Sequence, residues 1–148
     1  MLADFQQALA DLTASPELCI AARQDPSVLN DRYVLNEREW HRLTGIVNHK
    51  GMECACIVYR ANRLAPLALN IPRTCKALGQ DLRAVVSEFW KEFPETNVHF
   101  FVETERFCRF LQSKLLDGGQ FPPELPRILD EEYFIIRAAL AESYTEGC

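Results

Sequence analysis

The residues best suited to chemistry in this sequence are its six cysteines and three histidines. Only Cys54 and Cys56 stand close together, as Cys-Ala-Cys, whereas zinc and redox sites use wider C-x-x-C-type pairs. In a helix, the two thiols of a C-x-C pair point to different sides. The histidines, His41, His49 and His99, form no pair at the spacing of metal ligands. We therefore expect cysteines that belong to a hydrophobic core, and no metal ligand on this chain.

Other catalytic motifs are also missing from the sequence. It contains no glycine-rich phosphate loop, no G-x-S-x-G elbow and no H-E-x-x-H zinc motif. The carboxylates of Glu103, Glu105 and residues 130–132 have the pattern of solvated helix surface. We predict that the chain has no catalytic residue of its own. One alternative stays open: a stand-alone enzyme in which Cys56 or Cys75 acts as a nucleophile or zinc ligand.

A polar cluster, Tyr59-Arg60-Ala61-Asn62-Arg63, lies in an otherwise apolar stretch. Helical spacing places Tyr59, Asn62 and Arg63 within about one turn of each other. A buried arginine must find carboxylates or carbonyls, and a buried asparagine must find amides. The cluster predicts either a surface for a partner or peptide, formed by Arg60, Asn62 and Arg63, or a polar staple between neighbouring helices.

The elements that must position these groups are mostly helices. Ser15-Pro16-Glu17 combines an N-cap residue, a proline at the first helical position and an acid in the first turn. Asn36 and Glu39 have the spacing of a capping box. The first third of the chain is therefore predicted to form short helices that pack closely together.

Helical periodicity continues through the rest of the chain. The apolar-rich segment from Met52 to Leu69 is expected to be helical until Pro66 disturbs it. Apolar residues recur at helical spacing from Leu82 to Phe93, where Pro94 stops the pattern. A last helix is expected over residues 124–144.

One segment has strand character. It is short and rich in β-branched and aromatic residues, and consists of Asn97, Val98, His99, Phe100, Phe101 and Val102. A lone strand in a helical protein must pair with a small sheet or offer its edge to an extended peptide. The predicted fold class is mainly α, a compact multi-helix protein with a small β element, and residues 1–148 are expected to form a single domain.

Composition and charge narrow the class of protein. With 148 residues and 48% hydrophobic side chains, the chain is expected to bury a core. It has no secretion signal and no apolar run long enough for a membrane span, which predicts a soluble, cytoplasmic protein with free thiols. The net charge of −5 argues against a nucleic-acid binder. Residues 50–83, however, carry six basic against two acidic side chains, and such an island can receive an acidic peptide or partner.

Several of these segments together resemble a family. Residues 59–63, 71–79 and 82–94 look like the "YRxN … P-x-T-x-x-L-G … W/F-x-x-x-x-P" pattern of accessory proteins that work with multinuclear iron-dependent oxidative enzymes. Residues 107–111 and 125–130 are similar to the "F-x-x-F-L" and "LP-x-L-x-D" landmarks of that group. Short length and many cysteines make the chain most similar to the MbnC-like accessory subunits of methanobactin-type peptide biosynthesis.

The resemblance implies a heterodimer in which one subunit is catalytic and the other is not. A large TIM-barrel-like, MbnB-like partner would hold the iron and oxidise cysteines of a ribosomally made precursor peptide to oxazolone and thioamide groups. The small subunit would bind that enzyme and help to seat the leader peptide, with no metal or cofactor of its own. The resemblance makes residues 97–102 the first candidate for leader binding, and Arg60, Asn62 and Arg63 the next candidates for the peptide or the partner.

A weaker resemblance concerns the N-terminal third. Residues 25–43 look like the small helical subunit of certain extradiol dioxygenases, which also covers a partner's iron site without supplying its ligands. It favours the same architecture. Besides the stand-alone thiol or zinc enzyme, a protein-interaction module unrelated to iron chemistry remains an alternative.

Overall fold

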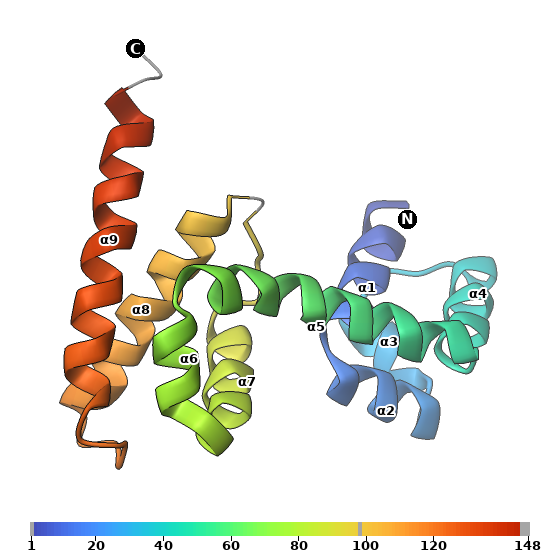
Figure 1. Ribbon diagram of the computed structural model, residues 1–148. Coiled ribbons are helices and arrows are strands. Elements are labelled where there is room, and N and C mark those ends of the chain that lie inside the picture. Colours follow the sequence, from blue (N-terminus) through green and yellow to red (C-terminus); the bar gives the residue numbers. More distant parts are fainter. Residues whose placement is uncertain (1, 98, 146–148) are drawn as a thin grey trace. The chain divides into compact units, whose positions relative to one another are not determined.

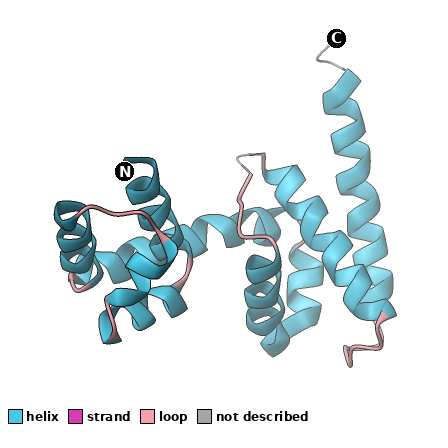
Figure 2. Ribbon diagram, turned by 180° about the vertical axis from the view of Figure 1, so that it is seen from behind, coloured by secondary structure: helices cyan, strands magenta, loops and turns pink. Residues whose placement is uncertain are grey.

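The computed structural model describes residues 2–97 and 99–145, which consist of helices and loops (Figures 1 and 2). The prediction of a mainly α fold is confirmed. The chain divides into two compact units, residues 1–61 and residues 62–148. Helix α5, Lys50–Asn70, contains the boundary between them. That residues 1–148 act as a single domain stays a prediction.

The first unit is a cluster of short helices around its own core. Two sequence signals position them: the Ser15 hydroxyl accepts a hydrogen bond from the Leu18 amide, and Asn36 and Glu39 form a reciprocal capping box. Both predicted helix starts are confirmed. The helices before α5 are α1 (Leu2–Ala14), α2 (Pro16–Gln24), α3 (Ser27–Arg32) and α4 (Glu37–Val47). Their core consists of Ala8, Leu12, Leu18, Cys19, Ala22, Leu29, Leu43, Val47, Met52 and Cys56.

The second unit packs longer helices around a larger, aromatic core. After α5 come α6 (Pro72–Leu78), the 3-10 turn η1 (Gly79–Asp81), α7 (Leu82–Glu92), α8 (Phe100–Leu116) and α9 (Leu125–Thr145). Helix α9 packs along α8 and α6 (Figure 1). Phe89 lies at the centre and meets Phe107 edge to face, with ring centroids 5.3 Å apart. The predicted last helix is confirmed to within a residue at each end.

The prediction that Pro66 disturbs its helix was wrong, because α5 continues through it to Asn70. A proline inside a helix costs about 3 kcal/mol. Leu67 and Ile71 follow on the core side and are fully buried, and each such burial contributes about 1.5–3 kcal/mol. The Thr104 hydroxyl also donates a hydrogen bond to the Pro66 carbonyl at 3.3 Å. Packing in the second unit therefore keeps the helix continuous.

The prediction of a β element over residues 97–102 was wrong as well, since the described residues contain no strand. Phe100–Val102 form the first turn of α8, and His99 precedes it as N-cap residue. The Asn97 side-chain carbonyl accepts a hydrogen bond from the His99 amide at 2.8 Å, which turns the chain into the helix. Val98 lies outside the described residues. This segment enters a helix and not a strand, because the helical spacing of α8 places Glu103, Thr104 and Phe107 on one buried face.

Candidate functional site

Among the predicted binding residues, Arg63 is an internal staple. Its side chain is 3% exposed and forms an ion pair with Glu103, which is 1% exposed, at a shortest distance of 2.7 Å. The guanidinium also donates to the carbonyls of Phe93, at 2.8 Å, and Pro94, at 3.4 Å. It lies 5.7 Å from the ring centroids of Phe89 and of Trp90. Of the two interpretations of the polar cluster, the structure supports the staple for Arg63.

The other two residues of that cluster lie elsewhere. Asn62 is exposed on α5 at the start of the second unit. Arg60 belongs to the first unit, where its partly buried side chain lines an apolar pocket beside Ile20 and Met52. A role of Arg60 and Asn62 in binding a partner or a peptide stays a prediction.

Glu103 and Glu132 contradict the prediction that their carboxylates are solvated surface. Glu103 is 1% exposed and Glu132 6% exposed. Glu132 accepts hydrogen bonds from the amides of Arg73 and Thr74 and from the Thr74 hydroxyl, at 3.0, 2.8 and 2.6 Å. The carboxylate therefore accepts hydrogen bonds from backbone amides in the first turn of α6, which have no carbonyl partner within the helix. A single sequence does not distinguish these buried acids from their exposed neighbours.

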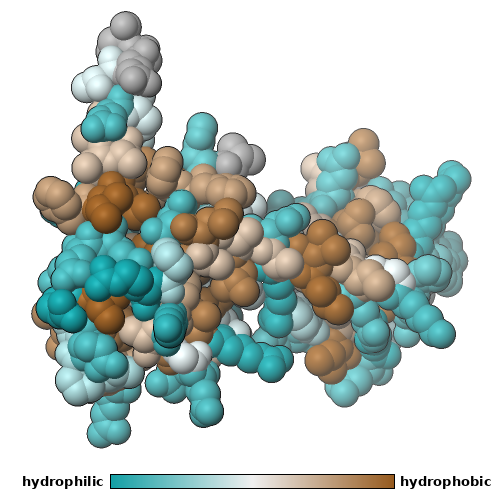
Figure 3. Space-filling view, viewed as in Figure 1, coloured by the Kyte–Doolittle hydropathy of each residue, from teal (hydrophilic) through white to brown (hydrophobic). Residues whose placement is uncertain are grey.

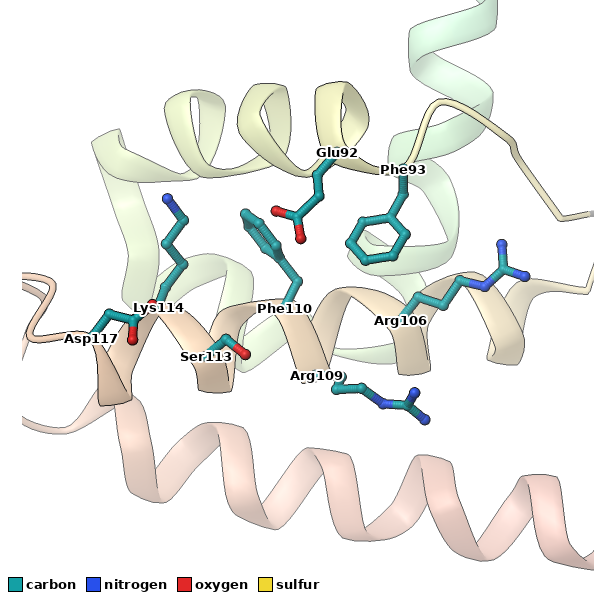
Figure 4. A pocket seen from close by; sticks show the side chains of 8 residues that line it. All are labelled: Glu92, Phe93, Arg106, Arg109, Phe110, Ser113, Lys114 and Asp117. Atoms are coloured by element: carbon teal, nitrogen blue, oxygen red, sulfur yellow. The ribbon is translucent and has the colours of Figure 1, made fainter.

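A groove in the surface of the second unit lies between α7 and α8 (Figure 4). Its volume is about 430 Å³. Phe93 and Phe110 lie next to each other in the close-up, one from each side of the groove. Their centroids are 6.4 Å apart, with the rings nearly perpendicular. The remaining lining residues are Glu92, Arg106, Arg109, Ser113, Lys114 and Asp117.

The groove is lined by basic and acidic side chains. Arg106, Arg109 and Lys114 lie with Glu92 and Asp117, and two of the three basic groups are paired with acids beside the groove. Arg109 is held by Glu105 at 2.6 Å, while Lys114 pairs with Glu88 and lies 5.5 Å from the Phe110 ring centroid. Hydrogen bonding to Glu105 raises the pKa of the Arg109 guanidinium, and hydrogen bonding to Glu88 raises that of the Lys114 ammonium, so both stay charged. Apolar rings beside charged groups of both signs suit a peptide with an aromatic or aliphatic anchor and charged neighbours.

The sequence analysis missed this groove, although one signal was available. Arg106, Arg109, Phe110, Ser113 and Lys114 recur at i, i+3, i+4, i+7 and i+8, so they share one face of α8. The predicted peptide segment leads directly into this helix. Phe100 and Phe101, at its start, are 48% and 41% exposed. A peptide role for residues 97–102 stays a prediction, and the last three of them, residues 100–102, lie in α8 and not on a strand edge.

The cysteines proposed for the alternative enzyme are poorly suited to nucleophilic attack. Burial raises the pKa of the Cys75 thiol to about 11, with a contribution from the nearby Glu132 carboxylate. Burial likewise raises the pKa of Cys108 to about 12. Cys56 is 8% exposed. A thiol is a nucleophile only as thiolate, and burial of Cys75 and Cys108 favours their protonated form.

The thiols should therefore alkylate at very different rates. With Cys148 replaced by serine, iodoacetamide at pH 7.5 should modify the exposed Cys54 about 100-fold faster than Cys75. The pKa of about 11 reduces the thiolate fraction of Cys75 about 100-fold relative to an ordinary thiol, and its side chain is also partly buried. Peptide mass spectrometry over time measures each rate. In urea, which unfolds the chain, Cys54 and Cys75 should be alkylated at similar rates. Modification of Cys75 as fast as Cys54 in the folded chain would favour the enzyme alternative.

No group of three histidine, cysteine, aspartate or glutamate side chains placed to hold a metal ion occurs in residues 2–97 and 99–145. Within the same residues, no helix is both long and apolar enough to cross a membrane. Comparison with family models, with curated proteins and with solved structures finds no match for this chain.

Proposed function

We propose that this chain is the non-catalytic accessory subunit of a multinuclear iron-dependent oxidase that modifies cysteines of a ribosomally made precursor peptide. It binds the large iron enzyme and helps to seat the leader peptide, as the MbnC-like resemblance implies. The observation that carries the proposal is the groove between α7 and α8, which combines two aromatic rings with three basic side chains.

The segments that carry the resemblance have coherent structural roles in the second unit. Thr74, in the segment of residues 71–79, donates hydrogen bonds from its amide and its hydroxyl to the Glu132 carboxylate. Phe107, Phe110 and Leu111 of "F-x-x-F-L" are buried in the core. Phe110 also lines the groove. These residues take part in the packing of the second unit, which places α7 and α8 beside each other, and a fold shared with the accessory subunits is part of the proposal.

Exposed apolar side chains supply a surface for the large enzyme. On α9, Phe134 and Ile135 are 67% and 63% exposed, and on α5, Leu69 is 69% exposed. Figure 3 shows hydrophobic residues at the surface of both units. Large contiguous patches of exposed apolar surface are rare on monomeric proteins and are typical of protein interfaces. These residues are the first positions at which to seek contacts with the oxidase.

Co-expression tests the proposal as a whole. The chain should co-purify with a large iron enzyme encoded beside it and contain no stoichiometric iron when purified alone. Oxidation of the neighbouring cysteine-containing precursor peptide, followed by mass spectrometry, should require both proteins. Turnover by this chain alone, or full activity of the large enzyme without it, would contradict the proposal.

Charge reversal tests the groove. The double substitution Arg106→Glu and Arg109→Glu should weaken binding of the fluorescently labelled leader peptide to the heterodimer by about 10-fold or more, because opposite charges become like charges. Arg83→Glu, on an exposed part of α7 outside the groove lining, is the matched control. Equal losses in the double variant and the control would place the peptide elsewhere. Circular dichroism of the heterodimer components checks that the helices remain.

A further inference from the structure

Three sulfur-containing side chains of the first unit, Cys19, Met52 and Cys56, line one pocket. Met52 and Cys56 are four residues apart on α5 and therefore share a face of that helix, while Cys19 comes from α2. The three side chains are 4%, 8% and 4% exposed, in that order. The pocket has a volume of about 340 Å³ and is lined mainly by apolar atoms.

The two thiols converge on a single atom. Cys19 Sγ donates a hydrogen bond to the Leu12 carbonyl oxygen at 3.0 Å, and Cys56 Sγ donates to the same oxygen at 3.5 Å. The distance between the two sulfur atoms therefore cannot exceed the sum of these two sulfur–oxygen distances. The proximity of Cys56 adds to burial in raising the pKa of Cys19 to about 12, so both effects keep a proton on this thiol in the absence of a cation.

We infer that Cys19, Cys56 and Met52 form a binding site for a soft monovalent cation, Cu(I). Thiol and thioether sulfur are the donors that such an ion prefers, and two or three of them satisfy it. Zinc instead requires four ligands drawn from sulfur, nitrogen and oxygen. The only carboxylate lining the pocket, Glu53, is held by Arg23 at 3.1 Å. The proposal is independent of the proposed function in peptide modification.

The surroundings balance the charge of the bound ion. Binding forms two Cu–S bonds and breaks two S–H bonds, so that Cu(I) and two thiols give a bis-thiolate complex of charge −1 and two protons enter solvent. The Met52 thioether adds a neutral donor without a proton. The charged groups that line the pocket are Arg23, Glu53 and Arg60. Their sum is +1, which is opposite in sign to the charge of the complex.

A cation titration tests the site on the full chain. The probe is Cu(I) delivered from its bicinchoninate complex to reduced protein without oxygen, with Zn(II) in a parallel titration. The expected result is one Cu(I) per chain, release of two protons and an X-ray absorption spectrum with only sulfur neighbours. Cys19→Ser and Cys56→Ser should each weaken binding by about 100-fold, and Met52→Leu by about 10-fold.

Two controls separate this site from other thiols, and one ligand variant tests it without changing a cysteine. Cys54→Ser removes an exposed thiol, and Cys75→Ser removes one thiol of the second unit, so both should leave the affinity unchanged. Met52→Leu preserves apolar volume, and its loss of affinity therefore decides the matter even if a serine variant fails to fold. Unchanged affinity in Met52→Leu, loss of binding in Cys75→Ser, or Zn(II) affinity equal to that for Cu(I) would each overturn the proposal.

Discussion

Replacing Arg63 by alanine should lower the free energy of unfolding of the second unit by about 3–5 kcal/mol. The substitution leaves the Glu103 carboxylate, 1% exposed, without its cation. It also removes the donors to the carbonyls of Phe93 and Pro94, which end α7 and begin the connection to α8. A buried charge without its partner is costly because water no longer solvates it. Few other single substitutions in this chain combine these losses.

Urea unfolding followed by tryptophan fluorescence measures this effect. In a Trp40→Phe background the signal comes from Trp90, which lies 5.7 Å from the Arg63 guanidinium carbon by its ring centroid. Arg73→Ala is the control: its pair with Glu131 is 53% and 44% exposed, so its loss should cost less than about 1 kcal/mol. The double variant Arg63→Met, Glu103→Leu should recover much of the stability. Equal effects of Arg63→Ala and Arg73→Ala would show that the ion pair is not a staple.

Replacing Glu132 by alanine should lower the free energy of unfolding of the second unit by about 3 kcal/mol, because it removes a buried acceptor of three hydrogen bonds. The amides of Arg73 and Thr74 then lack a partner at the N-terminus of α6. Glu132→Gln should cost less than alanine but remain destabilising, since its amide nitrogen cannot accept. Glu131→Ala, next to it on the exposed face of α9, should change stability by less than about 1 kcal/mol.

Hydrogen exchange localises the effect of Glu132→Ala. Amides of α6 and of the 3-10 turn after it should exchange faster than in the parent chain, while those of α1 to α4 in the first unit should not change. Uniform acceleration through both units would mean that the variant unfolds globally and would contradict a local capping role.

Local sequence signals determined most helix boundaries. Ser15 and the Asn36–Glu39 box act within three residues of themselves, so their hydrogen bonds form wherever the chain enters a helix. Helical periodicity from Leu82 to Phe93 likewise depends only on spacing along the chain. Where local signals conflicted, at Pro66 and at residues 97–102, burial of distant side chains decided the outcome.

The sequence by itself therefore determined that this protein is helical, and where most helices begin and end. Only the tertiary structure decided which polar residues are internal and which form a surface. Arg63 meets Glu103 across 40 positions of sequence, and Thr74 meets Glu132 across 58. The groove beside Phe93 and Phe110, and the convergence of Cys19 with Cys56, also depend on how helices pack. The chemical type of a buried polar side chain determines which hydrogen-bond or ion-pair partner it needs. Whether that partner lies nearby depends on how the helices pack in the tertiary structure.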